Sequence, residues 1–189
     1  MSLDGVETPD VASEFRRLRL GGAVAVLGGI LLAGAIAAVL ALAADGGEPD
    51  PKRILYPAFA MFFLIAAVLT RMGWLRVNAV LGGDVSLRFY RTFDEGDEPE
   101  ALRVVTRNFI NLFEMPVLFY VAVLMAYVTA QVSHWLVGLA WAYVALRVAH
   151  TSIHLGSNDV VLRLSAYAAS GIVLLVLWGT LLAKLWNAA

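Results

Sequence analysis

Three polar residues share one face at the start of a long apolar segment. Arg107, Asn111 and Glu114 are spaced at i, i+4 and i+7 within RVVTRNFINLFEMP, residues 103–116. In a helix they lie within about 60° of arc. The apolar segment 117–130 follows directly. If Arg107 marks the membrane boundary, Glu114 lies in hydrocarbon, where a carboxylate is costly unless the protein satisfies it. This polar face therefore indicates more than a membrane anchor.

A second polar face lies later in the chain. Arg147, His150 and His154 are spaced at i, i+3 and i+7, and Arg163 opens the next apolar segment. Arginine binds carboxylates through two hydrogen bonds, asparagine offers a donor and an acceptor, and a glutamate accepts from an ammonium group. The two faces together favour a small ligand with carboxylates, an amine and amides. Glutathione is such a ligand.

Two other roles compete with ligand binding. The polar groups could form buried ion pairs that fix the register of the helices, although register needs only one such contact. His150 and His154 at i and i+4 are also spaced like a zinc-binding pair. However, Thr151 stands where a helical zinc protease has its glutamate, and the arginines would repel a cation. We therefore predict no metal site.

The composition indicates a membrane protein. Of 189 residues, 60% are hydrophobic, and the mean hydropathy is +0.76. The formal net charge of −1 argues against a nucleic-acid partner, which needs a broad basic surface. The chain has no cysteine, which excludes disulfides, thiolate metal sites and a cysteine nucleophile. Any thiol chemistry must use a thiol that a ligand brings.

The start of the chain predicts one membrane helix of its own. A polar lead at 1–19 precedes 20–44, which is uncharged and long enough to cross about 30 Å of hydrocarbon. A signal peptide is the alternative, because the ALA sequence at 41–43 resembles a cleavage site. Its apolar core is usually only about 7–15 residues long, so we expect an uncleaved helix.

Four further spans are expected downstream, which gives an all-α, multi-pass helical bundle. The polar stretch 76–102 is the expected aqueous loop, and residues 131–134, QVSH, mark a break in the later apolar stretch. The four spans are a second helix over 54–75, a third that ends near Ala130, a fourth that begins near Trp135 and a fifth over 164–183.

The basic residues predict the orientation. With the N-terminus in the cytoplasm, eleven arginines lie on the cytoplasmic side and three basic residues lie outside, in agreement with the positive-inside rule. The eleven are Arg16, Arg17, Arg19, Arg71, Arg76, Arg88, Arg91, Arg103, Arg107, Arg147 and Arg163, against Lys52, Arg53 and Lys184. Both polar faces then converge at the cytoplasmic side of the membrane.

These motifs resemble the MAPEG family, the membrane-associated proteins of eicosanoid and glutathione metabolism. The resemblance lies in R-x-x-x-N-x-x-E from Arg107 to Glu114, with Pro116 just after it. It also lies in R-x-x-H-x-x-x-H from Arg147 to His154, where the family commonly has tyrosines at the histidine positions. The segments ILYPAFAMFF and RMGWLRVNAVLGG add to the resemblance, which covers about residues 54–186.

The resemblance implies a four-helix domain at 54–186 with the helix at 20–44 as an addition. It implies a homotrimer in a bacterial inner membrane, with glutathione bound between protomers near the cytoplasmic face. Its substrate would be a lipophilic electrophile or a lipid from the bilayer. The helix at 20–44 could recruit another membrane subunit. The alternative is a non-catalytic accessory or lipid-binding subunit of a larger membrane complex.

The resemblance also assigns roles to the polar residues. One arginine would stabilise the glutathione thiolate, because a free thiol has a pKa of about 8.5 and a nearby cation lowers it. That arginine is Arg163 or, failing that, Arg147. The residues implied to hold glutathione are Arg107, Asn111 and Glu114, with further polar contacts from His150 and His154.

Overall fold

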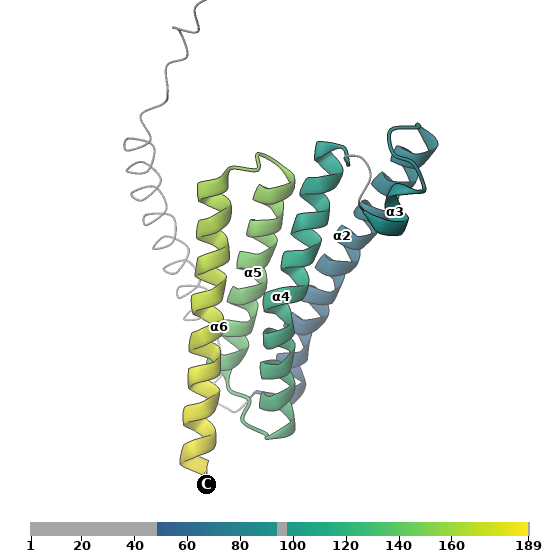
Figure 1. Cartoon of the computed structure of the whole chain (residues 1–189). Helices are drawn as coiled ribbons and strands as arrows, with labels where there is room; N and C mark the ends of the chain where they lie inside the picture. The colour runs from purple at the N-terminus through teal and green to yellow at the C-terminus, as the bar shows by residue number, and fades with distance from the viewer. Residues whose placement is uncertain (1–48, 94–97, 189) are drawn as a thin grey trace, which may run out of the picture.

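The computed structural model describes residues 49–93 and 98–188, and all the regular structure in these ranges is helical (Figure 1). Four helices, the first of them extended by η1, are long and apolar enough to cross a membrane. The predicted all-α membrane bundle is therefore confirmed for this part. The predicted lead at 1–19 and helix at 20–44 lie outside the described residues. The elements are η1 (Pro51–Ile54), α2 (Leu55–Leu81), α3 (Phe89–Thr92), α4 (Glu100–Val128), α5 (His134–Leu155) and α6 (Val160–Ala188).

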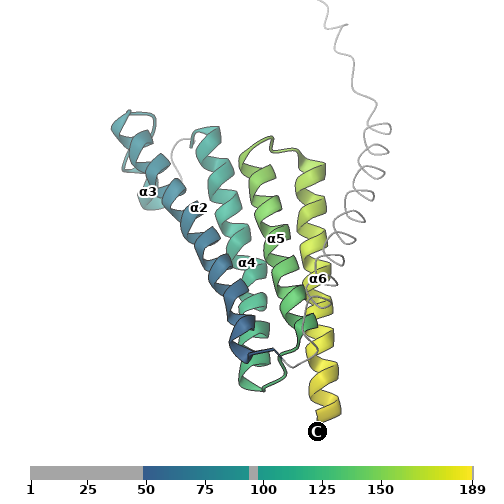
Figure 2. The same cartoon turned by 180° about the vertical axis from the view of Figure 1, so that it is seen from behind.

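The four long helices stand side by side and alternate in direction (Figures 1 and 2). α5 packs mainly against α6, and α2 packs mainly against α4, while α4 also contacts α5. The end of α2, the start of α4, the end of α5 and the start of α6 therefore share one end of the bundle. We call this the arginine end, because most of the arginines of the described chain lie there.

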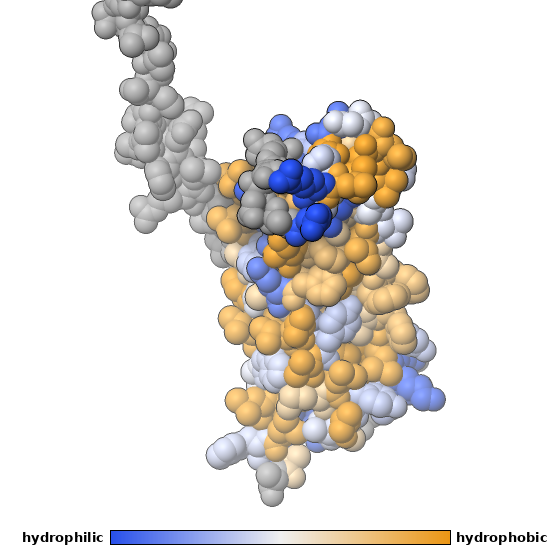
Figure 3. Space-filling model, turned by 45° about the vertical axis from the view of Figure 1, so that its right-hand side comes forward, coloured by the Kyte–Doolittle hydropathy of each residue, from blue (hydrophilic) through white to orange (hydrophobic). Residues whose placement is uncertain are grey.

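Buried and exposed side chains follow the helical period. On α2, Met61, Val68 and Met72 are buried at spacings of seven and four, which places them on one face. Between α4 and α5, the rings of Phe119 and Tyr143 stack with centroids 4.6 Å apart. Apolar side chains cover most of the height of the face drawn in Figure 3, and hydrophilic groups gather near its ends. That surface suits a lipid environment.

The break between α4 and α5 lies where the sequence predicts it. α4 ends at Val128, Ala130 adopts a left-handed backbone with φ of 54°, and α5 begins at His134. Ser133 caps α5, since its hydroxyl oxygen accepts a hydrogen bond of 3.4 Å from the N–H of Leu136. A capping serine and a left-handed residue thus divide one long apolar stretch into two antiparallel helices.

The connection between α2 and α4 is shorter than the loop expected at 76–102. α2 continues to Leu81, and Gly83, with φ of 80°, lies in the turn that follows. α4 begins at Glu100, directly after Pro99. Arg76 and Asn78 are polar and indicate that the chain leaves the hydrocarbon there, but a helix can continue into water. Backbone breakers such as Gly83 and Pro99, rather than polarity, set the helix ends.

Candidate functional site

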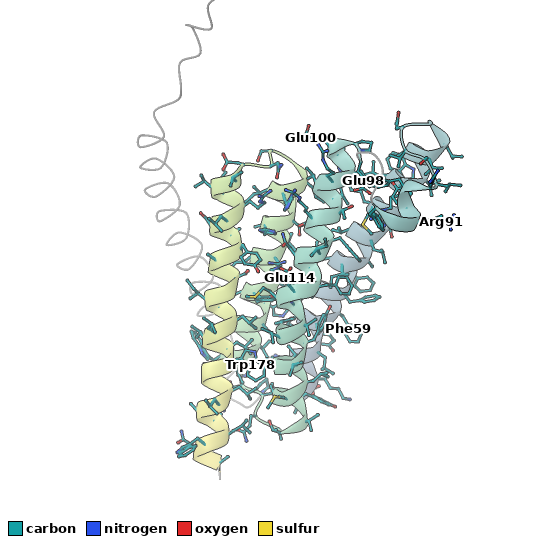
Figure 4. All side chains as sticks on the ribbon, in the orientation of Figure 1. Phe59, Arg91, Glu98, Glu100, Glu114 and Trp178 are labelled. Atoms are coloured by element: carbon teal, nitrogen blue, oxygen red, sulfur yellow. The ribbon has the colours of Figure 1, made fainter. Side chains whose placement is uncertain are left out.

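The three predicted site residues of α4 lie on the edge of its buried face rather than within it. Asn111 is half-buried, whereas Arg107 and Glu114 are exposed in the protomer. Figure 4 shows Glu114 near the middle of the bundle's height and Glu100 at the arginine end. α4 thus presents an exposed carboxylate well inside the span.

The polar residues of α5 are buried instead. Arg147 is 0% exposed, and His150 and His154 are each 2% exposed. α5 is the most enclosed of the four membrane-spanning helices, so polar groups on this face are removed from both lipid and water. Buried polar groups of this kind need partners, and their partners define the site.

Arg147 ties α5 to α4. Its Nη2 donates a hydrogen bond of 2.7 Å to the backbone carbonyl oxygen of Asn111. Its guanidinium carbon also lies 5.4 Å from the centre of the Tyr167 ring on α6. Arg147 therefore joins three helices.

Arg163 organises the arginine end of the site. Its Nη1 donates to the side-chain oxygen of Asn158 at 2.6 Å and lies 3.5 Å from Nε2 of His154. The backbone carbonyl oxygen of Arg163 lies 3.0 Å from Nδ1 of His150. One residue of α6 therefore contacts both histidines of α5, once through its side chain and once through its main chain.

A hollow of about 240 Å³ opens where α4, α5 and α6 meet. It contains three of the predicted site residues, one from each helix, together with a tyrosine and two apolar residues. Arg107, Glu114, Arg147 and His154 do not line it. The lining residues are Asn111, His150, Arg163, Tyr167, Val160 and Leu164.

The charges around the hollow are only partly balanced. The carboxylate of Glu114 acts electrostatically on Arg147, but within 49–93 and 98–188 it forms no ion pair. Nε and Nη1 of Arg147 have no hydrogen-bond partner among the described atoms. A register-fixing ion pair between Glu114 and a neighbouring arginine is therefore absent from this part of the protomer.

A larger hollow of about 560 Å³ lies at the arginine end between α2, α4 and α5. Its polar lining residues are Arg71, Glu100, His154, Ser157 and Asn158. Asn158 also accepts the hydrogen bond from Arg163. His154 therefore borders this second hollow rather than the first. Spacing along one helix placed the two histidines on one face, but packing separates them between two cavities.

Sequence reasoning missed two residues of this region. Tyr167 lines the smaller hollow and stands one turn after Arg163, so an i, i+4 search from that arginine would have found it. Asn108 is 0% exposed, and neither atom of its amide has a partner among the described residues. The only signal for Asn108 was an amide within an apolar pattern next to Arg107.

A comparison with models of protein families matches residues 54–183 to the MAPEG family. This match covers more than half of the 189 residues. The chain belongs to the MAPEG family. The MAPEG match begins at the end of η1 and extends into α6, so it takes in the whole four-helix bundle and both polar faces. Comparison with curated proteins and with solved structures gives no significant match.

Proposed function

We propose that this integral membrane protein binds glutathione and uses its thiolate against lipophilic electrophiles or peroxidised lipids. The observation that supports this most directly is the hollow of about 240 Å³. There Asn111, His150 and Arg163 meet from three helices and supply donors and acceptors in an otherwise apolar bundle. Buried polar groups at membrane depth are costly, so a group of them around an open hollow favours a ligand.

The available groups fit the groups of glutathione. Arg107 and Arg163 offer guanidinium donors for carboxylates, and Glu114 offers an acceptor for the ammonium group. The side chain of Asn111 can donate to and accept from an amide. His150 also lines the hollow, and its Nε2 is buried and has no partner among the described residues. When bound, glutathione supplies the nucleophilic sulfur that this cysteine-free chain lacks.

Arg163 suits the stabilisation of the thiolate better than Arg147 does. Arg163 is half-buried and lines the hollow. Arg147 does not line the hollow, and it is 0% exposed. A guanidinium beside a thiol favours the thiolate and so provides the nucleophile at neutral pH. We therefore assign Arg163 to the thiolate and Arg147 to holding the helices around it.

A homotrimer would complete the site. The hollow of about 240 Å³ is smaller than the usual ligand pocket of about 300–1,000 Å³, and one side of it is open. Arg107 and Glu114 are exposed in the protomer, beside this hollow on α4. A neighbouring protomer packed against α4 would enclose both charges and the ligand. Trimerisation, which the family resemblance implies, thus accounts for charges that a single protomer leaves uncovered.

We further propose a bacterial inner membrane and a cytoplasmic N-terminus. The arginine end of the described bundle carries eight arginines, whereas the other end carries Lys52, Arg53 and Lys184. The positive-inside rule then places both hollows on the cytoplasmic side, where glutathione is available. In this arrangement the segment 20–44 would cross the same membrane and could contact another membrane subunit.

A lipid-binding subunit without catalysis is the second candidate. An apolar groove of about 460 Å³ between α2 and α4 supports it, and Phe59 is labelled there in Figure 4. This groove could hold a lipid in either candidate, as substrate or as stable ligand. Its lining residues are Leu55, Ala58, Phe59, Phe62, Phe63, Tyr120 and Leu124.

Titration calorimetry with glutathione on the detergent-solubilised protein tests the proposal. We expect binding, together with ultraviolet absorbance from a bound thiolate at neutral pH. The variant Arg163→Met should lose the thiolate absorbance. The wild-type protein should conjugate glutathione to a lipophilic electrophile, and Arg163→Met should lose this activity together with the thiolate absorbance. Binding of lipid but not of glutathione would reject the enzyme and favour the lipid-binding subunit.

A further inference from the structure

The backbone carbonyl of Arg163 determines how the proton of His150 is placed. Nδ1 of His150 lies 3.0 Å from that carbonyl oxygen. A carbonyl oxygen can only accept, so the ring nitrogen facing it must carry a hydrogen. In the neutral ring the other nitrogen then holds a lone pair, whichever way round the ring is turned. His150 therefore presents a proton acceptor.

The residue that carries this acceptor lines the hollow beside Asn111, Arg163 and Tyr167. Nε2 of His150 is buried and has no hydrogen-bond partner among the described residues. The guanidinium of Arg163 can only donate. A lone pair on a neutral base next to a cation is an arrangement that accepts a proton from an acid and stabilises the anion left behind.

The groups that face His150 from the neighbouring elements are cationic, aromatic or uncharged. On its own helix it faces Arg147 and His154, and on α6 it faces Arg163 and the ring of Tyr167. On α4 the neighbouring lining residue, Asn111, is uncharged.

The charged groups of α4 act on other residues of α5. The carboxylate of Glu114 acts on Arg147, and the guanidinium of Arg107 acts on His154. No charged group of α2 acts on His150 within the described chain. A thiolate formed among these cations would have its charge balanced, whether by Arg163 or by an imidazolium at His150.

We propose that Nε2 of His150 is the general base that takes the proton from the thiol of glutathione. This inference rests on the proposed function and adds a catalytic residue to it. Arg163 would stabilise the negative sulfur, while His150 would hold the proton within the site. The histidine stands where the family commonly has a phenol, and a neutral imidazole is a stronger base than a neutral phenol.

The step balances without a further reagent. The S–H bond breaks and its proton forms a bond to Nε2, which gives a thiolate and an imidazolium. The sulfur electron pair then forms an S–C bond to an electrophilic carbon, and the electron pair of that carbon's double bond moves to the adjacent atom. That atom takes the proton from Nε2, and His150 returns to its neutral form.

His154 provides the matched contrast. The guanidinium of Arg163, which can only donate, lies 3.5 Å from Nε2 of His154. That nitrogen is the acceptor, so Nδ1 carries the hydrogen of the neutral ring. His154 borders the other hollow and has its lone pair facing a cation. The two histidines are therefore not equivalent, and the base is His150.

The variant His150→Asn isolates the base. The amide nitrogen of asparagine can reproduce the Nδ1 donor to the carbonyl of Arg163, but no group remains in place of Nε2. His134→Asn, at the start of the same helix and outside the linings of both hollows, is the matched control. Thermal unfolding checks that both variants fold. Two ligands are titrated against each protein: glutathione, and S-methylglutathione, which has no thiol proton. The thiolate absorbance is followed as a function of pH.

In His150→Asn we expect the thiolate titration to move by about one pH unit toward the ordinary thiol pKa of about 8.5, an approximately tenfold loss of thiolate near neutrality. Affinity for S-methylglutathione should fall less than affinity for glutathione. His134→Asn should not move the titration. Equal losses for both ligands with an unchanged titration would make His150 a mere contact and overturn the proposal.

Proton counting gives a second readout. If His150 keeps the thiol proton, wild-type thiolate forms with no net release of protons to the buffer. Calorimetry in two buffers of different ionisation enthalpy measures this release. Release of a full proton for each bound thiolate would reject His150 as the base while leaving glutathione binding intact. Failure of the wild-type protein to bind glutathione would instead reject the proposed function itself, and this inference with it.

Discussion

Nη2 of Arg147 donates a hydrogen bond of 2.7 Å to the backbone carbonyl oxygen of Asn111, which fastens the middle of α5 to the middle of α4. The side chain of Asn111 lines the smaller hollow, while its main chain receives this bond. Because Arg147 is 0% exposed, the contact is removed from water and from lipid. The buried arginine thereby sets the register at which α4 presents its polar edge to the site.

Replacing this arginine should therefore affect folding more than chemistry. In Arg147→Met the carbonyl of Asn111 loses its donor and Tyr167 loses the cation beside its ring, so we expect the free energy of unfolding to fall by about 1–3 kcal/mol. Thermal unfolding in detergent measures this. Arg163→Met, in a half-buried position, is the control and should cost less stability. Equal destabilisation by the two variants would contradict a distinct structural role for Arg147.

The order of the four described spans was predictable because it depends on local features. Charges and apolar runs mark the membrane crossings, and a serine such as Ser133 can cap a helix that begins an apolar run. The helix ends next to the loop expected at 76–102 were not predictable from polarity alone, because a helix can continue into water. The structure instead ends α2 at Leu81 before a glycine turn and begins α4 directly after Pro99.

The site was predictable only in part. Spacing placed Arg107, Asn111 and Glu114 on one face, but it does not give the rotation of that face within the bundle. Packing decides that Asn111 lines a hollow, that Glu114 points outward and that Asn108 is enclosed. Such rotations depend on contacts between distant segments, such as the bond from Arg147 to the main chain of α4. The roles of these residues in binding stay predictions.

Glu114 and Arg107 should affect binding without affecting the fold of the protomer. Both are exposed, so we expect Glu114→Gln and Arg107→Gln to unfold at nearly the wild-type temperature. Each loses a charge-assisted hydrogen bond of about 1.5–3 kcal/mol to glutathione, which lowers affinity by roughly tenfold to a hundredfold. Titration calorimetry measures the change. The control is Glu100→Gln, at the arginine end of the same helix (Figure 4). Unchanged affinity in both variants would remove α4 from the site.

The buried amide of Asn108 should make the bundle less stable than an apolar side chain of similar size would. Both amide atoms are buried and have no partner within the described chain, and each such group costs about 1–3 kcal/mol. We therefore expect Asn108→Leu, of similar size and apolar, to raise the unfolding temperature. Asn78→Leu, at an exposed position near the end of α2, is the control and should change it little. A lower unfolding temperature for Asn108→Leu would show that the amide has partners in the assembled protein.

Glycine is required at position 156 because the backbone there passes close to the carbonyl of Ser152 at the end of α5. A Cβ at this position would lie 2.8 Å from the backbone carbonyl oxygen of Ser152, so Gly156→Ala must displace the turn that leads into α6. We expect a loss of about 1–3 kcal/mol in the free energy of unfolding. Asn158, in the same turn, accepts the 2.6 Å hydrogen bond from Arg163, so glutathione affinity should fall as well. The matched control is Gly73→Ala within α2, where nothing lies within 4 Å of the added carbon. Alanine favours a helix interior over glycine by roughly 0.5–1 kcal/mol, so this variant should be neutral or more stable. Thermal unfolding and calorimetry on both variants measure the two effects.

If Gly156→Ala lost stability but kept full glutathione affinity, the turn at the end of α5 would not be what holds Arg163 in place.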